Sequence, residues 1–302
     1  MRALASPASL KGVLSARDAA VALAKGLCEG GADTEEVPIA DGGEGTAEVL
    51  GAEVVEVVRV HDAFGRRREA PIRALGEDVV IEAADAIPLD PQLLDPFAAS
   101  SRGLGELIEA VGECRRLIVC LGGTANVDGG AGLALQGLPA ETIALCDALV
   151  PLRDAARVFA QQKGASADDA VELERRLAAM EELAPYAGLP GAGAAGGLGA
   201  ALAALGAKLV PGSRYVLERI GFAQRARAAN LAVTGEGAVD ATTTEGKAPG
   251  EAVQVCREIG VRCVVFGGRV EQELEGVETI ALSGDPGRAR EDLVELGRRL
   301  AA

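Results

Sequence analysis

Short apolar runs alternate with segments of helical spacing at both ends of the chain. Near the amino terminus, residues 2–6 are a strand candidate, and the Ala/Leu spacing of residues 14–28 predicts a helix with Ser15 as its N-cap. Near the carboxyl terminus, helical spacing returns over residues 250–259 and 289–301. This alternation is typical of an α/β fold built on a parallel sheet.

The middle of the chain has a different pattern. Three β-branched runs, at residues 54–61, 68–74 and 78–83, are separated by glycine and charged residues and predict adjacent antiparallel strands. The matching ends and the dissimilar middle predict an inserted domain. We expect a Rossmann-like α/β domain over residues 1–51 and 222–302, interrupted by a second mixed α/β domain over residues 52–221.

The remaining elements are predicted from shorter patterns. Strands are expected at 34–39, 117–121, 143–146, 231–233, 263–266 and 278–282. Helices are expected at 47–50, 103–111 and 168–183, and a turn at Gly267 and Gly268.

Polar, glycine-rich loops follow several of the strands or open a helix. They cover residues 7–12, 40–46, 122–130, 190–199 and 234–249. Glycine lets a backbone approach a ligand closely, and successive N–H groups bind anions. The carboxylates that could hold Mg²⁺ are Asp41, Glu44, Asp128, Glu236 and Asp240, and the cations that could stabilise a transferring group are Lys11, Lys163 and Lys247. This inventory favours phosphoryl transfer, although each loop alone is equally a tight turn with a helix cap.

Composition removes several other functions. The 302 residues are 49% hydrophobic, and the mean hydropathy of +0.20 indicates a substantial core. The net charge of −15 argues against a nucleic-acid partner. A single histidine, His61, excludes a histidine-based triad and a zinc site with several histidines, and it is expected to be a strand or surface residue.

The cysteines and the lack of special motifs narrow the choice further. The six cysteines form no CxxC pair, and no leader-like or long apolar segment is present, so a reduced, cytoplasmic protein without a membrane partner is expected. A Walker P-loop and a strict GxGxxG after a strand are both absent, which disfavours a Rossmann dehydrogenase.

Taken together and in order, the loops resemble those of the bacterial glycerate kinases of the two-domain type. The similarity rests on PASLKGVLSA, PIADGGEGT, GGTANVDGG, QKGA, PGAGAAGGLGA and TGEGAVDATTTEGKAP, which span residues 7–249. The resemblance implies transfer of the ATP γ-phosphate to D-glycerate with Mg²⁺. The usual product of the family is 2-phosphoglycerate, and 3-phosphoglycerate is the alternative. It also implies an active site in the cleft between the two domains.

The resemblance and the loop positions together assign candidate roles. Asp41 or Asp128 is expected to be the general base, and Lys11 to pair with the glycerate carboxylate or a phosphate. Substrate is expected to contact Ser9, Lys11, Gly42, Gly43, Thr124 and Asn126. ATP is expected to contact Gly193, Gly196, Gly197, Gly199, Thr234, Gly235 and Lys247. The expected Mg²⁺ ligands are Asp240 and Glu236.

Four positions depart from the family pattern. Ala8 stands where an aspartate is usual, Leu149 and Val150 replace polar residues, and Thr242 replaces a glutamine. These changes leave two further hypotheses open. One is a catalytically impaired sensor of the same fold that binds glycerate or nucleotide, and the other is a kinase of a different small hydroxy acid.

Overall fold

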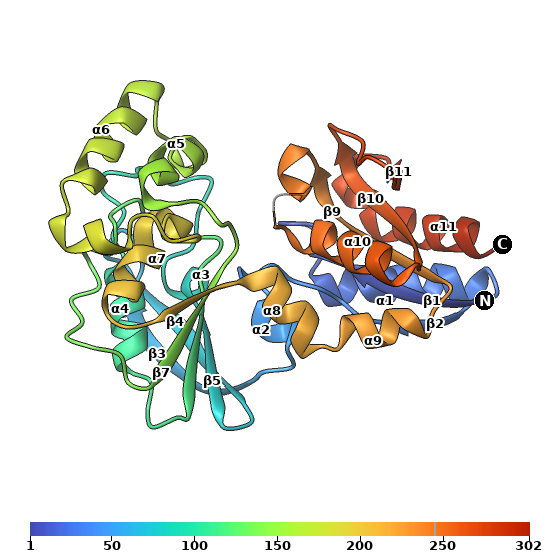
Figure 1. Ribbon diagram of the computed structural model, residues 1–302, viewed down its shortest axis with the longest axis horizontal. Helices are drawn as coiled ribbons and strands as arrows, with labels where there is room; N and C mark the ends of the chain where they lie inside the picture. The colour runs from blue at the N-terminus through green and yellow to red at the C-terminus, as the bar shows by residue number, and fades with distance from the viewer. Residues whose placement is uncertain (245) are drawn as a thin grey trace. The chain divides into compact units, whose positions relative to one another are not determined.

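The computed structural model describes residues 1–244 and 246–302 (Figure 1). The chain divides into two compact units. The first unit comprises Met1–Asp41, Glu48–Leu50 and Ser213–Ala302, and the second comprises Gly42–Ala47 and Gly51–Gly212. None of the helices in the described part of the chain is both long enough and apolar enough to cross a membrane.

The first unit is built on a five-stranded parallel sheet with the strand order β11-β10-β9-β1-β2. Its strands are β1 (Arg2–Pro7), β2 (Asp33–Glu36), β9 (Leu231–Val239), β10 (Arg262–Val270) and β11 (Glu278–Ala281). Its helices are α1 (Ala16–Glu29), α8 (Gly212–Arg219), α9 (Phe222–Arg227), α10 (Ala248–Ile259) and α11 (Ala289–Ala301), of which α8 starts at the unit boundary. The predicted Rossmann-like parallel sheet is confirmed.

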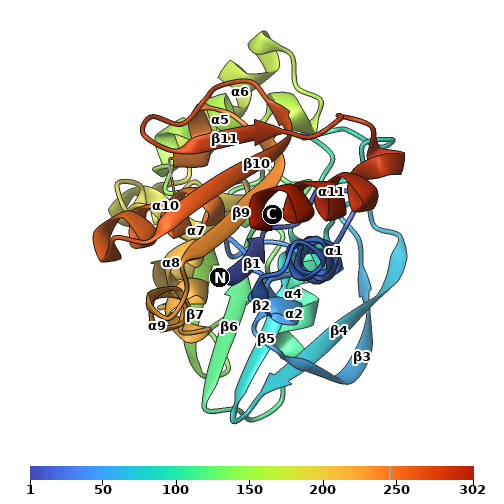
Figure 2. The ribbon, with the colours of Figure 1, turned by 90° about the vertical axis from the view of Figure 1, so that its right-hand side faces the viewer.

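Side chains alternate between the two faces of this sheet, so each face packs against its own helices. Val233 and Phe266 pack with α1 and α11, which Figure 2 shows side by side. Leu4 and Ala232 pack on the opposite face with α9 and α10. The two helices α1 and α11 can approach closely because Gly26 has no side chain. A Cβ added at Gly26 would lie only 2.1 Å from a main-chain oxygen of α11.

The second unit contains a six-stranded mixed sheet with the strand order β3-β4-β5-β6-β7-β8. Its strands are β3 (Glu53–His61), β4 (Arg67–Leu75), β5 (Asp78–Glu82), β6 (Arg116–Cys120), β7 (Glu141–Cys146) and β8 (Lys208–Pro211). The first three strands are antiparallel, as the β-branched runs predict, and the pairs from β5 to β8 are parallel. This confirms the predicted mixed α/β character of the middle segment.

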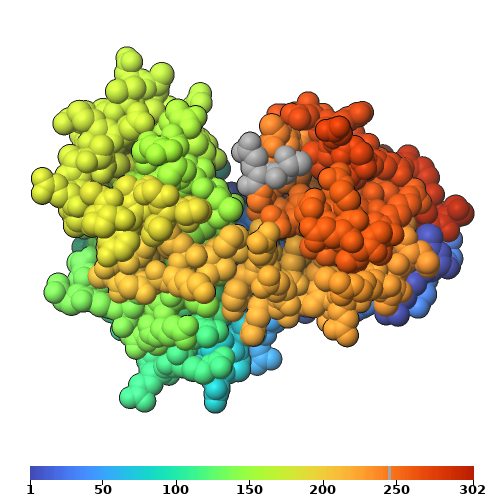
Figure 3. Space-filling model, viewed as in Figure 1, coloured from blue at the N-terminus to red at the C-terminus, as the bar shows by residue number. Residues whose placement is uncertain are grey.

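Helices pack around this second sheet and its strand-end loops. They are α3 (Ala83–Ala86), α4 (Arg102–Glu109), α5 (Ala155–Phe159), α6 (Ala167–Ala178) and α7 (Ala194–Ala204). The short α2 (Thr46–Val49) contains residues assigned to both units. Short 3-10 helices lie at Leu152–Asp154, Gln161–Lys163 and Glu181–Tyr186 in the second unit, and at Ala241–Thr244 and Pro286–Arg288 in the first. Helix α6 lies at the surface of its unit (Figure 3) and buries only Leu173 and Leu177.

Two glycine-rich segments that predict loops are strands in the structure. Strand β9 continues to Val239, so the loop expected from residue 234 begins only after this strand. Strand β10 runs through the turn expected at Gly267 and Gly268. The glycines allow neighbouring strands to approach closely. A Cβ added at Gly235 of β9 would lie 2.2 Å from the Phe266 oxygen of β10.

Two further predicted boundaries are wrong. Strand β2 ends at Glu36 rather than at residue 39, because Pro38 cannot donate to the sheet, although Ile39 still donates to the Pro7 carbonyl at 3.0 Å. Helix α6 ends at Ala178 rather than at residue 183, and a 3-10 turn containing Pro185 follows it.

Candidate functional site

In the first unit, the loop that follows β1 lies beside the extended end of β9. The Ala8 amide donates to the Gly235 carbonyl at 2.8 Å. A Cβ added at Gly237 would lie 3.6 Å from the main-chain nitrogen of Lys11. Ser9 and Lys11 follow β1, which ends at Pro7, so both lie at the carboxyl end of the parallel strands. The Lys11 side chain is exposed and Ser9 is half-buried. Ligands of open α/β sheets bind at this edge.

The carboxyl-terminal part of β9 and the segment that follows it carry two carboxylates and one lysine that lie close together. The Lys247 Nζ lies 3.4 Å from Glu236 Oε2 and 3.7 Å from Asp240 Oδ1. The Thr243 hydroxyl donates to Glu236 Oε1 at 2.9 Å, and the Thr242 amide donates to Asp240 Oδ1 at 2.7 Å. The structure therefore brings together the two predicted metal ligands and Lys247. Glu245 of the same motif lies outside the described residues.

The two carboxylates of this cluster have pKa values shifted in opposite directions. Burial raises the pKa of Glu236, and the charge of Asp41 adds to this effect against the opposing charge of Lys247. Burial also disfavours ionised Asp240, but the hydrogen bonds from Thr242 and the charge of Lys247 outweigh it, so the pKa of Asp240 is lowered. Glu236 and Asp41 together therefore form a negative site that a cation would stabilise.

The donor set of this cluster fits a magnesium ion that is shared with a ligand. Over residues 1–244 and 246–302, no group of three or more histidine, cysteine, aspartate or glutamate side chains could enclose a metal. Mg²⁺ is usually bound through one or two carboxylates together with substrate phosphates, and not by an all-protein cage. Glu236 and Asp240 fit that mode, because they supply two carboxylates next to a lysine.

Thr234 and Gly235 lie inside β9 and not in the loop expected for them. The Thr234 side chain is fully buried, and its hydroxyl has no hydrogen-bond partner among the described residues. The position where Gly235 lacks a Cβ faces Phe266. The glycine at position 235 is thus explained by strand packing, and neither residue presents a side chain at the surface of the sheet edge.

In the second unit, the loop that precedes α2 is held by buried polar groups. The Gly42 amide donates to the Thr46 hydroxyl at 3.1 Å. Glu82 accepts from the Gly45 amide at 3.0 Å and from the Ala47 amide at 2.8 Å. Gly42 has a left-handed φ of 94°, which favours glycine. The next residue, Gly43, packs closely against Gly122, since a Cβ added at Gly122 would lie 2.7 Å from the Gly43 Cα.

Asp128, one of the two expected bases, accepts several hydrogen bonds that hold its own loop. Its Oδ2 atom accepts from the Ser101 amide and hydroxyl at 2.7 and 2.8 Å. Its Oδ1 atom accepts from Asn126 Nδ2 at 2.9 Å and from the Gly130 amide at 3.1 Å. Both carboxylate oxygens are therefore engaged in holding the loop.

Lys163, named as a possible partner of a transferring group, is buried beneath the same loop. Its side chain is only 3% exposed, and its Nζ donates to the Asn126 carbonyl at 2.7 Å. The Asn126 side chain also donates to the Ala195 carbonyl at 3.2 Å. Two predicted substrate contacts, Thr124 Oγ1 and Asn126 Oδ1, are buried and have no hydrogen-bond partner among the described residues. They are the polar atoms of this loop that a ligand could still satisfy.

The glycine-rich turn that opens α7 is shaped by packing. Ala195, Gly196 and Gly197 have φ values of 51°, 67° and 97°, which interrupt the helix at its first turn. A Cβ on Gly196 would lie 2.2 Å from the Asn126 oxygen, and one on Gly199 would lie 2.0 Å from the Gly191 oxygen. The same holds for Gly193, where a Cβ would lie 2.6 Å from the Pro151 oxygen. Close protein contacts therefore explain why glycine occupies these positions, and their contact with ATP stays a prediction.

The structure also places two acidic residues at strand ends that the sequence patterns do not single out. Glu82 ends β5, and Asp147 directly follows β7. A Cβ on Gly122 would lie 2.9 Å from an Asp147 carboxylate oxygen, so this carboxylate lies beside the glycines of the loop after β6. The available signal was the same for both: a single acid at the carboxyl end of an otherwise apolar run.

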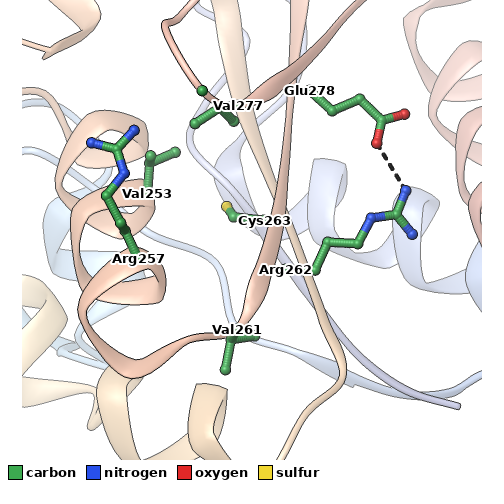
Figure 4. A pocket seen from close by; sticks show the side chains of 8 residues that line it. Val253, Arg257, Val261, Arg262, Cys263, Val277 and Glu278 are labelled. Carbon is green, nitrogen blue, oxygen red and sulfur yellow. Dashed lines mark hydrogen bonds and ion pairs between the residues drawn. The ribbon is translucent and has the colours of Figure 1, made fainter.

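A cavity of about 330 Å³ lies elsewhere in the first unit. Figure 4 shows Val253 and Arg257 of α10 on one side of it, with Cys263 and the Arg262–Glu278 ion pair of β10 and β11 on the other. These residues mark the carboxyl end of α10 and the amino ends of the two strands. The cavity is therefore at the opposite edge of the sheet from the strand-end loops and is separate from the candidate site.

A family model described as the glycerate kinase family matches residues 3–144 and 136–284 of this chain. The chain is 34% identical over 309 residues to a protein named glycerate 2-kinase from Escherichia coli, covering 82% of this chain and 80% of the relative. It is 32% identical over 340 residues to a protein named glycerate kinase from Bacillus subtilis, covering 92% and 87%. An uncharacterized protein of Mycobacterium bovis is 35% identical over 315 residues, covering 93% and 82%.

A solved structure has the same fold over the full chain. It is a crystal structure of a protein assigned as glycerate kinase 2 from Salmonella typhimurium LT2, with a TM-score of 0.77 and 28% sequence identity. The similarity covers 100% of this chain and 97% of that one. The α/β fold described above is thus shared with a protein of known structure.

Proposed function

Because this chain belongs to the glycerate kinase family and is a kinase, we propose that it transfers the γ-phosphoryl group of ATP to the 2-hydroxyl of D-glycerate. The products are then 2-phosphoglycerate and ADP. The relative named glycerate 2-kinase supports this position of transfer. The structural observation that supports phosphoryl transfer best is the cluster of Glu236, Asp240 and Lys247 at the end of β9, because it combines carboxylates for Mg²⁺ with a cation for phosphate.

In this proposal, Asp41 is the general base. The 2-hydroxyl oxygen of glycerate bonds to the γ-phosphorus, its proton passes to the Asp41 carboxylate, and the bond to the bridging oxygen of ADP breaks. Asp41 is preferred to Asp128 because both oxygens of Asp128 already accept several hydrogen bonds. Asp41 also lies close enough to Glu236 to affect its pKa.

The cations have separate tasks. Lys11, exposed at the end of β1, pairs with the glycerate carboxylate or a phosphate. Lys247 leaves its carboxylate partners to contact the transferring phosphate. Its ammonium group can move because the lysine side chain is flexible. Glu236 and Asp240 would hold Mg²⁺, which when bound neutralises the charge of the phosphate oxygens.

The proposal is tested by phosphorus NMR of the product formed from D-glycerate, ATP and MgCl₂. The expected result is the resonance of 2-phosphoglycerate together with ADP, and no product without Mg²⁺. A 3-phosphoglycerate resonance would show that the position of transfer is wrong.

The two other hypotheses are outcomes of the same assay. Binding of D-glycerate or ATP without turnover would replace the kinase with a sensor of the same fold. Faster ADP release with another small hydroxy acid in a substrate panel would replace glycerate as the acceptor.

A further inference from the structure

Glu82 is a buried acid at the carboxyl end of β5. It follows the apolar residues Val79, Val80 and Ile81, and its side chain is only 4% exposed. It pairs in register with Cys120 of the neighbouring strand β6. A buried glutamate is uncommon unless its charge is compensated, so its partners identify its role.

Those partners are main-chain N–H groups of the glycine loop before α2. Oε2 accepts from Gly45 at 3.0 Å, and Oε1 accepts from Ala47 at 2.8 Å. These N–H groups lie at the start of α2, where a helix leaves its first amides without internal partners. The nearby cation Arg73 is directed elsewhere, since its Nη1 donates to Asp85 at 2.6 Å. The carboxylate of Glu82 is therefore satisfied by the loop.

The same loop follows the proposed base. Gly42, the residue after Asp41, is fixed by the hydrogen bond of its amide to the Thr46 hydroxyl. Thr46 lies between Gly45 and Ala47, the two residues that Glu82 holds. A chain of contacts thus runs from Glu82 through the start of α2 to the peptide that follows Asp41.

We propose that Glu82 is a positioning residue, which holds the loop of residues 42–47 through its main chain and so sets the orientation of Asp41. The inference rests on the proposed function for its kinetic consequence. Its structural part, the anchoring of the loop, stands independently of which substrate is phosphorylated. Glu82 itself is not placed in contact with substrate.

The charge state of Glu82 depends on the groups around it. Burial raises its pKa, and Asp85 of α3 adds to the increase. The amides of Ala47 and Gly45 and the charge of Arg73 on β4 oppose it. A protonated carboxyl would turn an O–H toward one amide donor and lose that hydrogen bond. Acid should therefore loosen the loop in the native protein, and a variant that cannot ionise should lack this response.

The test compares Glu82→Gln with Glu77→Gln, which makes the same exchange at an exposed side chain just before β5. The glutamine has the same shape but offers one acceptor oxygen, and its NH₂ group faces the other amide. Hydrogen exchange over residues 42–47 is expected to be faster in Glu82→Gln and unchanged in Glu77→Gln. The kcat with D-glycerate should fall about ten- to a hundredfold in Glu82→Gln, with the KM for ATP retained, because a displaced catalytic group slows the reaction step.

Unchanged exchange over residues 42–47 together with native kcat in Glu82→Gln would overturn the inference. So would a pH dependence of hydrogen exchange over residues 42–47 that is identical in Glu82→Gln and the native protein. If Glu82→Gln does not fold, Glu82→Asp replaces it, since the shorter side chain keeps the charge but cannot span both amides. If the native protein does not phosphorylate glycerate, the exchange comparison still decides the anchoring.

Discussion

Asp41 and Asp128 both directly precede glycine in strand-end loops, and their surroundings separate their roles. Asp128 receives hydrogen bonds from Ser101, Asn126 and Gly130, so its lone pairs are directed into its own loop. Asp41 contributes to the raised pKa of Glu236 and is therefore near the proposed phosphate-binding cluster. Sequence alone left these two candidates equal, because both have the same residue type in the same kind of loop.

We expect Asp41→Asn to lower kcat by about 10²- to 10⁴-fold, the usual contribution of a general base. The substitution keeps the size of the side chain and removes its ability to accept a proton. Steady-state kinetics with D-glycerate measures the effect. Asp128→Asn is the matched control, and it should mainly lower the melting temperature, because amide donors of its loop lose an acceptor at a cost of about 1–3 kcal/mol. Near-normal turnover of Asp41→Asn would contradict the assignment.

Thr243→Val should move the acid limb of kcat/KM to higher pH. The Thr243 hydroxyl stabilises ionised Glu236, so its removal raises a pKa that burial has already raised. The ionised form is the proposed metal ligand, and a higher pKa means that this form is lost earlier as the pH falls. Measuring kcat/KM against pH checks the direction of the shift.

Thr242→Val is the control for that experiment. Its hydroxyl and amide bond Asp240 and not Glu236, and they help to lower the pKa of Asp240. The limb assigned to Glu236 should therefore keep its position. An equal shift in both variants would show that Glu236 is not the group observed.

At the scale of elements, local sequence signals predicted where helices begin more accurately than they predicted the structure of glycine-rich segments. Ser15 caps α1 by accepting from the Asp18 amide at 3.1 Å, and Pro249 lies in the first turn of α10. In β9 and β10, however, glycines mark close contacts between strands rather than turns. A single sequence cannot separate these two uses of glycine, because the neighbouring chain that requires a missing Cβ comes from a distant segment.

The turn at the start of α7 provides a direct test of this packing role. Gly196→Ala adds a Cβ that would lie 2.2 Å from the Asn126 oxygen at a φ of 67°. The strained backbone costs about 1–3 kcal/mol, and the overpacking adds a similar amount. Thermal unfolding should show a clearly lower melting temperature.

Gly206→Ala is the matched control. Gly206 also has a left-handed φ of 99°, but a Cβ there would have no atom within 4 Å. It should show only the backbone cost of about 1–3 kcal/mol. Equal destabilisation of the two variants would argue that contact with the Asn126 loop contributes nothing.

For the whole molecule, the carboxylate arrangement predicts how metal and nucleotide act together. Because the described residues form no three-ligand metal group, MgCl₂ alone should raise the melting temperature no more than NaCl at equal ionic strength. ADP with MgCl₂ should raise it further than ADP without metal, since bound ligands stabilise the folded state. Glu236→Gln should reduce this difference. A large effect of Mg²⁺ without nucleotide would indicate a separate metal site.

The order of apolar runs was sufficient to predict two α/β regions, a parallel sheet formed by the two ends of the chain and antiparallel strands in the middle. These features follow from local periodicity, which is written in neighbouring residues. The ordered loop motifs were also sufficient to indicate the family. The net charge of −15 contributed nothing to the prediction of the fold, because net charge bears on partners and not on fold.

Only the tertiary structure decided which polar residues are available for chemistry. It directed Asp128 and Lys163 into loop contacts, placed Thr234 inside a strand, and revealed Glu82 as an anchor of the loop after Asp41. The physical reason is that burial and hydrogen bonding join residues that are far apart in the chain. A carboxylate whose oxygens are satisfied by distant amides has the same sequence signature as one that awaits a substrate.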